Sequence, residues 1–193
     1  MRSVLTLILF LPGMVWALPD QFLPALQKAL DSDAAWQMEK VFVPSTLVLE
    51  SEGKVSCRVR NGIVWQVEKP FTKTIRLERD GLRMLVGGNL GGTPPGPLHK
   101  PPHYDRILEA VRDLSKGETS SIEHLFLLES LPTKEGWCIQ LTPREALLGR
   151  VVKRAVLWGN ELLERVEIID PQGGRTSLRF TPKQNLGAEF WGE

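Results

Sequence analysis

Apolar and polar side chains alternate along most of the chain after residue 36, and this period of two is typical of strands with one buried face. Turn residues separate the alternating runs, so we expect about nine antiparallel strands. Together with two helical segments they predict a mostly antiparallel α+β domain whose sheet curls around its apolar side. The candidate cavity residues on that side are Leu49, Val55, Cys57, Ile63, Trp65, Val67, Ile75, Leu77, Phe126, Leu128, Trp137, Ile139, Leu157, Val166 and Ile168.

The clearest hairpin surrounds residues 60–62, Arg-Asn-Gly. A two-residue turn at Asn-Gly would put Ser56 and Arg58 on the same face as Trp65. A three-residue loop, with Cys57 opposite Trp65, keeps one face continuously apolar. Because burial of that face fixes the register, we predict the three-residue loop.

Two segments instead have apolar residues at helical spacing. Residues 19–33 and 103–116 are predicted to form amphipathic helices, and the Gly- and Pro-rich residues 87–103 a long loop before the second one. After the first helix we expect one long strand over residues 36–49, with Pro44 at a bulge or an edge. The apolar stripes that could cover the sheet are Phe22, Leu26 and Leu30 in the first helix and Tyr104, Ile107, Leu108, Val111 and Leu114 in the second.

Residues 1–17 have the layout of a secretory signal peptide. Arg2 precedes an apolar run over residues 4–11, and Ala17 closes a small-residue cleavage site. The run is too short to span a membrane. We therefore expect cleavage after Ala17 and a single exported domain over residues 18–193, without stable membrane insertion.

Composition and motifs narrow the function classes. Lys and Arg number 24 against 23 Asp and Glu, so no basic excess exists to neutralise a nucleic acid. The chain has neither a nucleophile elbow nor a phosphate-binding loop, and we expect no enzyme activity and no cofactor. His99, His103 and Asp105 are conceivable metal ligands, but beside Pro-rich sequence they are better explained as solvated loop residues. We expect no metal site.

The two cysteines leave two possibilities open. An exported protein can form a disulfide between Cys57 and Cys138. The alternation of side chains between the two faces of a strand argues against the bond, because Cys57 shares the face of Trp65 whereas Cys138 lies opposite the face of Trp137. The sequence by itself does not decide between a disulfide and two free thiols.

The order of elements resembles the LolA family of periplasmic lipoprotein carriers, in its divergent LolA-like branch. The motifs that make the resemblance, in chain order, are Glu52-Gly53, Asn61-Gly62-Ile63-Val64-Trp65, Lys69-Pro70-Phe71, Asp80-Gly81, Lys116-Gly117, Gly136-Trp137-Cys138-Ile139-Gln140-Leu141-Thr142-Pro143, an Asp170-Pro171-Gln172-Gly173-Gly174 turn and Leu178-Arg179-Phe180-Thr181-Pro182. Each motif is short, and their order and spacing over almost the whole chain make the case.

The resemblance implies an unclosed antiparallel half-barrel with helices as a lid over its concave apolar face. It implies a monomer in the periplasm of a Gram-negative bacterium that binds acyl chains of lipids or lipoproteins without a cofactor. An inner-membrane donor and an outer-membrane acceptor protein would be its partners. One departure is clear: standard carriers have Arg-Pro in the hairpin before the Trp, and Val59 and Arg60 hold those positions here.

Two other functions stay open at this point. Related half-barrels of the cell envelope serve as lipid-binding sensors or interaction modules without cargo transfer. An envelope enzyme acting on lipids or polyketide-like chains is the third possibility, although no residue stands out as a nucleophile. Bound acyl mass in protein purified from a periplasm would favour the carrier.

Overall fold

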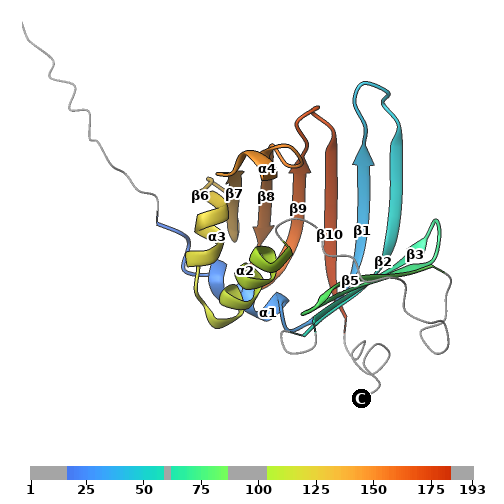
Figure 1. The fold of residues 1–193 in the computed structure, drawn as a ribbon. Coiled ribbons are helices and arrows are strands. Elements are labelled where there is room, and N and C mark those ends of the chain that lie inside the picture. The colour runs from blue at the N-terminus through green and yellow to red at the C-terminus, as the bar shows by residue number, and fades with distance from the viewer. Residues whose placement is uncertain (1–16, 59–61, 87–103, 184–193) are drawn as a thin grey trace, which may run out of the picture.

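One antiparallel sheet of ten strands organises the described part of the chain (Figure 1). The structure, a computed structural model, describes residues 17–58, 62–86 and 104–183. The strand order is β5-β4-β3-β2-β1-β10-β9-β8-β7-β6, so β5 and β6 form two edges and the sheet is not closed. This is the α+β class predicted from the sequence, an unclosed half-barrel with helices on one side.

The first strand of the sheet, β1, pairs with the last strand, β10, as well as with β2. The strands are β1 (Asp33–Val41), β2 (Val48–Arg58), β3 (Gly62–Lys69), β4 (Lys73–Glu78), β5 (Gly81–Val86), β6 (Phe126–Ser130), β7 (Trp137–Pro143), β8 (Arg154–Gly159), β9 (Leu163–Ile169) and β10 (Arg175–Lys183). The helices are α1 (Phe22–Ala29), α2 (Tyr104–Lys116), α3 (Ser120–Leu125) and α4 (Ala146–Gly149).

The prediction of a single long strand over residues 36–49 was wrong. β1 ends at Val41 and β2 begins at Val48, and Pro44 lies in the turn between them. The Phe42 amide donates to the Leu47 carbonyl at 2.9 Å and closes this turn. Phe42, Val43 and Leu47 of this turn are apolar, so the sequence continues the strand pattern although the chain reverses there.

The hairpin between β2 and β3 keeps the predicted face but not the predicted register. Cys57 lies opposite Ile63 rather than Trp65, a shift of two residues that leaves every side chain on its expected face. The return strand begins at Gly62, which has φ 108° and lies so close to β4 that a Cβ would be 2.2 Å from the Leu77 carbonyl oxygen. Residues 59–61 of the loop lie outside the described residues.

Most apolar residues of the strands share one side, here called the inner face, and the opposite side is the outer face. A row in register across five strands illustrates it: Ile139, Leu157, Val166, Leu178 and Met38. The strand pairing places all the candidate cavity residues predicted from the sequence on this inner face. The alternation therefore predicted the apolar side of the whole sheet correctly.

Helices cover part of the inner face. In Figure 1, α1 and α2 lie in front of the sheet, and the upper parts of β1 and β2 extend beyond them. The predicted second helix is confirmed as α2, whereas α1 is shorter than the predicted 19–33 because β1 already begins at Asp33. Among the described helices, none is both long and apolar enough to reach across a bilayer.

The predicted leader, residues 1–17, lies outside the described residues except for Ala17. The next residue, Leu18, packs against the hydrophobic core. The predicted loop over residues 87–103 also lies outside the described part of the chain, with His99 and His103 in it.

Candidate functional site

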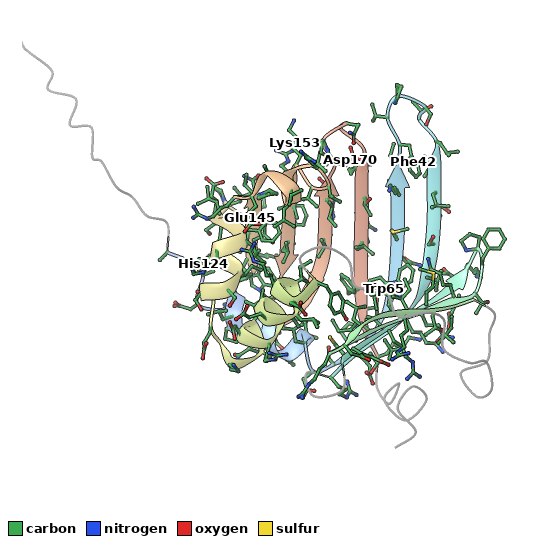
Figure 2. The ribbon with its side chains drawn as sticks, in the orientation of Figure 1. Phe42, Trp65, His124, Glu145, Lys153 and Asp170 are labelled. Carbon is green, nitrogen blue, oxygen red and sulfur yellow. The ribbon has the colours of Figure 1, made fainter. Side chains whose placement is uncertain are left out.

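Three aromatic residues meet on the inner face at the centre of the sheet, and we call them the aromatic cluster: Trp36 of β1, Trp65 of β3 and Phe180 of β10. The ring centroids are 4.7 Å apart for Trp36 and Trp65 and 6.2 Å apart for Trp65 and Phe180. Trp36 is 2% exposed, whereas Trp65 and Phe180 are half-buried. Figure 2 shows Trp65 in front of the sheet, on the side of the helices.

A glycine makes room for this cluster. Gly53 of β2 lies beside Trp36, at a register shift between Glu52 and Gly53. A Cβ on Gly53 would be 3.0 Å from the Trp36 ring and 1.9 Å from the Gln66 carbonyl oxygen. The Trp36 indole can therefore lie across β2 only because residue 53 has no side chain.

Sequence reasoning missed the inner-face residues of β1 and β10: Trp36, Met38, Leu178 and Phe180. Their alternation is present in the sequence, but β1 was merged with β2 into one strand. The pairing of β1 with β10 joins residues about as far apart as the described chain allows. No local pattern indicates that Trp36 and Phe180 would be neighbours.

Helix α2 lies over the inner face beside the aromatic cluster. Leu108 and Val111 line a pocket of about 40 Å³ together with Cys57, Ile63 and Leu77. The charged Arg58, Glu78, Arg79 and Arg112 also line it. Of the other predicted lid residues, Tyr104 and Leu114 are buried. Ile107 is 42% exposed and does not line this pocket, so its place in the lid stays a prediction.

A few polar contacts hold α2 in place. The Tyr104 hydroxyl lies 2.6 Å from the Glu78 carbonyl oxygen and 2.7 Å from that of Gly81, and it donates to the turn between β4 and β5. Burial raises the pKa of this hydroxyl, which keeps it protonated as a donor. Arg106 forms an ion pair with Glu145, just before α4.

At its other end, α2 contacts α1. The Gln27 side-chain amide donates to the Ser115 carbonyl at 3.3 Å. Leu114 packs into the cluster that also contains Phe22 and Leu26 of α1. The contacts that hold α2 are thus individually weak, since a neutral hydrogen bond contributes about 1 kcal/mol net.

The part of the inner face under α1 is filled. Phe22 is 0% exposed and packs edge-on against Trp137, with ring centroids 5.2 Å apart. Trp137 and Ile139 belong to the same buried cluster, with Leu30, Phe126, Leu128, Leu157 and Ile168 against it. These candidate cavity residues are core in this conformation.

The two cysteines are both free and buried. Cys57 lies on the inner face beneath α2, and Cys138 on the outer face, because it pairs with Trp158 beside the inner-face residues Trp137 and Ile139. The alternative of two free thiols is therefore the correct one. Burial raises the pKa of the Cys57 thiol from 9.0 to about 12, so it is a poor nucleophile at neutral pH.

Several polar residues in the described part of the chain make structural contacts. The buried Asp33 carboxylate accepts from the Ser56 hydroxyl at 2.7 Å and pairs with Arg58 at 3.0 Å, which accounts for its burial. No group of three or more possible metal ligands occurs in the described ranges. His124 is exposed and lies 2.7 Å from the Ser120 carbonyl oxygen.

A larger hollow lies on the outer face, with a volume of about 900 Å³. It is lined mainly by charged side chains, and ion pairs match several of them: Lys69 with Glu52 at 2.7 Å and Arg175 with Glu39 at 3.2 Å. Sequence analysis did not predict this hollow. Its charged lining makes it unsuitable for an apolar ligand.

Comparisons with known proteins add distant structural similarities. No protein-family model and no curated protein matches the chain. Among solved structures, the chain is similar to a putative outer membrane lipoprotein-sorting protein domain from Vibrio parahaemolyticus, with 12% identity, coverage of 86% of this chain and 93% of that chain, and a TM-score of 0.38. A DUF1329 family protein from Desulfovibrio piger is similar with 12% identity, coverage of 88% of this chain and 95% of that chain, and a TM-score of 0.38.

LprF from Mycobacterium bovis is a third similar structure, with 12% identity, coverage of 86% of this chain and 94% of that chain, and a TM-score of 0.33. At such identities and TM-scores these similarities decide neither the fold nor the function. The fold rests on the strand order and register of the chain itself.

Proposed function

We propose that this protein binds the acyl chains of lipids or lipoproteins along its inner face and carries them through the periplasm towards the outer membrane, without catalysis or a cofactor. The observation that supports this most is the single apolar face shared by the strands, which the helices fill only in part. The predicted leader and the resemblance to LolA-like carriers support the location and the direction of transport.

An acyl chain requires a conformation in which α2 has moved. Small-molecule pockets measure about 300–1,000 Å³, whereas the pocket between α2 and the sheet is about 40 Å³. Each methylene removed from water stabilises the complex by about 0.8 kcal/mol, so a long chain offsets the few contacts that hold α2. The aromatic cluster, next to this pocket, would then form the floor of the binding site.

A pair of charge insertions on α2 tests this proposal. Val111→Glu places a carboxylate against the apolar pocket, and Ile107→Glu adds the same charge to the same helix at a position that is already 42% exposed. We expect Val111→Glu to weaken binding of a fluorescent fatty acid at least tenfold and Ile107→Glu to leave it near that of the wild type, since an unpaired charge in an apolar site is costly.

The thermal midpoint is measured on the same samples. If Val111→Glu lowers the midpoint strongly while its folded fraction binds the probe normally, α2 is ordinary core and the proposed site is wrong. If both variants weaken binding equally, the effect comes from added charge on α2 and not from the pocket.

Native mass spectrometry of protein purified from a periplasm identifies the natural ligand. We expect adducts with the masses of acyl chains or acylated lipids. These adducts should disappear from Val111→Glu. A clean ligand-free mass for the wild type would contradict the carrier proposal.

The charged hollow on the outer face favours a second function, that of an envelope interaction module without cargo transfer. Its volume and matched charges suit a polar protein segment better than a lipid. Charge reversal at Arg179, which lines the hollow, separates the two. It should weaken partner capture in a module and leave fatty acid binding unchanged in a carrier.

A further inference from the structure

Two turns at one end of the sheet expose large apolar side chains. The turn between β1 and β2 exposes Val43 (50%) and Leu47 (61%). The connection between β7 and β8, which contains α4, exposes Leu147 (52%) and Val151 (69%). Exposed apolar side chains are common singly, but four of them on two turns at the same end of the sheet call for an explanation.

The strand pairing places these turns at the same end of the sheet, which we call its turn edge. Val41 pairs with Val48 and with Arg175, and Ile169 pairs with both Arg175 and Arg154. The ends of β1, β9 and β7 therefore meet at one end of the sheet. Figure 2 shows Phe42, Asp170 and Lys153 along its upper edge.

The same edge is basic. The segment 144–154 contains four basic residues and one acidic residue, and Arg144, Arg150, Lys153 and Arg154 are all exposed. Its single carboxylate, Glu145, is ion-paired with Arg106 of α2. In the described chain no ion pair involves any of the four basic side chains.

The neighbouring turns carry one cation and one anion. The Lys40 ammonium lies 4.7 Å from the centre of the Phe42 ring, beside the turn between β1 and β2. The Asp170 carboxylate accepts from the backbone amides of Gln172 and Gly174 at 2.9 and 2.8 Å. The edge as a whole thus combines apolar tips with a surplus of positive charge.

We propose that this edge, the basic apolar rim, docks the protein reversibly onto an anionic lipid bilayer. Its members are Val43, Leu47, Leu147, Val151, Arg144, Arg150, Lys153 and Arg154. Apolar tips enter the interface between headgroups and acyl chains, and the cations above them contact the anionic headgroups. A separated set of turn tips fits a fluid surface better than a protein partner, which would need a contiguous complementary patch.

Docking of this kind goes beyond carriage of acyl chains and does not depend on it. The rim lies at turns, whereas the proposed cargo site lies under α2. A vesicle-binding assay without any fatty acid therefore tests docking alone. Loss of fatty acid binding and loss of vesicle binding are separate results.

The experiment is co-flotation of the protein with vesicles of phosphatidylcholine mixed with phosphatidylglycerol, compared with vesicles of phosphatidylcholine alone. We expect the wild type to float with the anionic vesicles. The double variant Arg150→Glu/Lys153→Glu should bind them at least about tenfold more weakly, because each basic residue near the surface contributes measurably to attraction. Leu147→Ser/Val151→Ser should weaken binding while leaving its salt dependence unchanged.

The control variant Lys134→Glu/Lys183→Glu makes the same change in net charge at the opposite end of the sheet, where both side chains are exposed. We expect it to bind like the wild type, and circular dichroism confirms that all variants fold. Equal loss in the control, equal flotation with neutral vesicles, or no flotation of the wild type each overturns the proposal. The last result would leave the rim to a protein partner.

Discussion

Two tryptophans of this protein use the same local device in two different regions. Trp36 lies beside Gly53, and Trp137 lies beside Gly159, each at a register shift of the sheet. A Cβ on these glycines would be 3.0 Å from the Trp36 ring and 2.5 Å from the Trp137 ring. In both places an indole crosses a neighbouring strand that has no side chain to oppose it.

The surroundings of the two indoles differ. Trp137 donates its Nε1 hydrogen to the Asn160 carbonyl at 2.9 Å and packs against Phe22 of α1. Trp36 has a buried Nε1 without a hydrogen-bond partner in the described chain, and it stacks on the half-buried Trp65. We call the region of β6–β9 under α1 the closed half and the region of β1–β5 and β10 beside α2 the open half.

One apolar face thus serves two purposes in this protein. In the closed half, the helix supplies side chains that complete a core, and the Trp137 indole has both a packing partner and a hydrogen-bond acceptor. In the open half, aromatic side chains are left partly exposed beside a loosely held helix. Stability should therefore depend mainly on the closed half, and ligand binding on the open half.

Removing the central side chain of the closed half should have the largest effect. Trp137→Ala deletes a side chain that is 1% exposed, and we expect the free energy of unfolding to fall by about 3–5 kcal/mol. Urea denaturation measures this loss. A loss below about 1 kcal/mol would mean that the closed half is not the stabilising core.

In the open half, Trp65→Ala should impair binding more than stability. The side chain is half-buried, so we expect a loss of about 1–2 kcal/mol in unfolding free energy, and a fall of at least tenfold in fatty acid affinity. Trp158→Ala is the matched control, because Trp158 is also half-buried but lies on the outer face over Arg165. Equal binding by the two variants would contradict the assignment of the open half as the site.

The indole nitrogens give a finer comparison. Trp137→Phe removes a donor from the Asn160 carbonyl, whereas Trp36→Phe removes a buried donor that has no partner. Beyond the loss of ring size common to both, we expect Trp137→Phe to be more destabilising by about 1 kcal/mol. Thermal unfolding of the two variants checks the difference, and the reverse order would show that the unpaired nitrogen is not a cost.

A smaller effect is expected for the contacts that hold α2. Tyr104→Phe removes the hydroxyl that donates to the turn between β4 and β5, and the loss of about 1 kcal/mol should open α2 about fivefold more often. Cys57 reports this opening, because it lies beneath α2. We expect a thiol reagent to modify Cys57 about fivefold faster in the variant, with Cys138 on the outer face as the internal control.

Burial of Cys57 also makes the free energy of unfolding depend on pH. The pKa of Cys57 rises from 9.0 to about 12 in the folded state, so the folded protein holds this proton more tightly than the unfolded chain does. The resulting stabilisation is complete below about pH 9 and is lost as the pH rises towards 12. Unfolding free energies of wild type and Cys57→Ala should therefore converge over this range, and parallel pH profiles would contradict the assignment.

The sequence predicted the apolar face better than it predicted the ends of the strands. Parity alone placed Cys57, Trp65 and Ile63 on one face, and a register error of two residues left that result intact. The turn around Pro44 was mistaken for strand because Val43 and Leu47 continue the apolar pattern. Those residues are exposed, and exposure is not visible in a pattern of residue types.

What the sequence determined by itself is local: strands with one apolar side, the amphipathic helix α2, and a largely apolar run over residues 4–11. Alternation and helical spacing depend only on neighbouring residues, so they can be recognised without the fold. The tertiary structure decided which part of the apolar face becomes core and which stays open. That choice depends on the pairing of β1 with β10, which brings Trp36 beside Phe180, and on where α1 and α2 rest on the sheet.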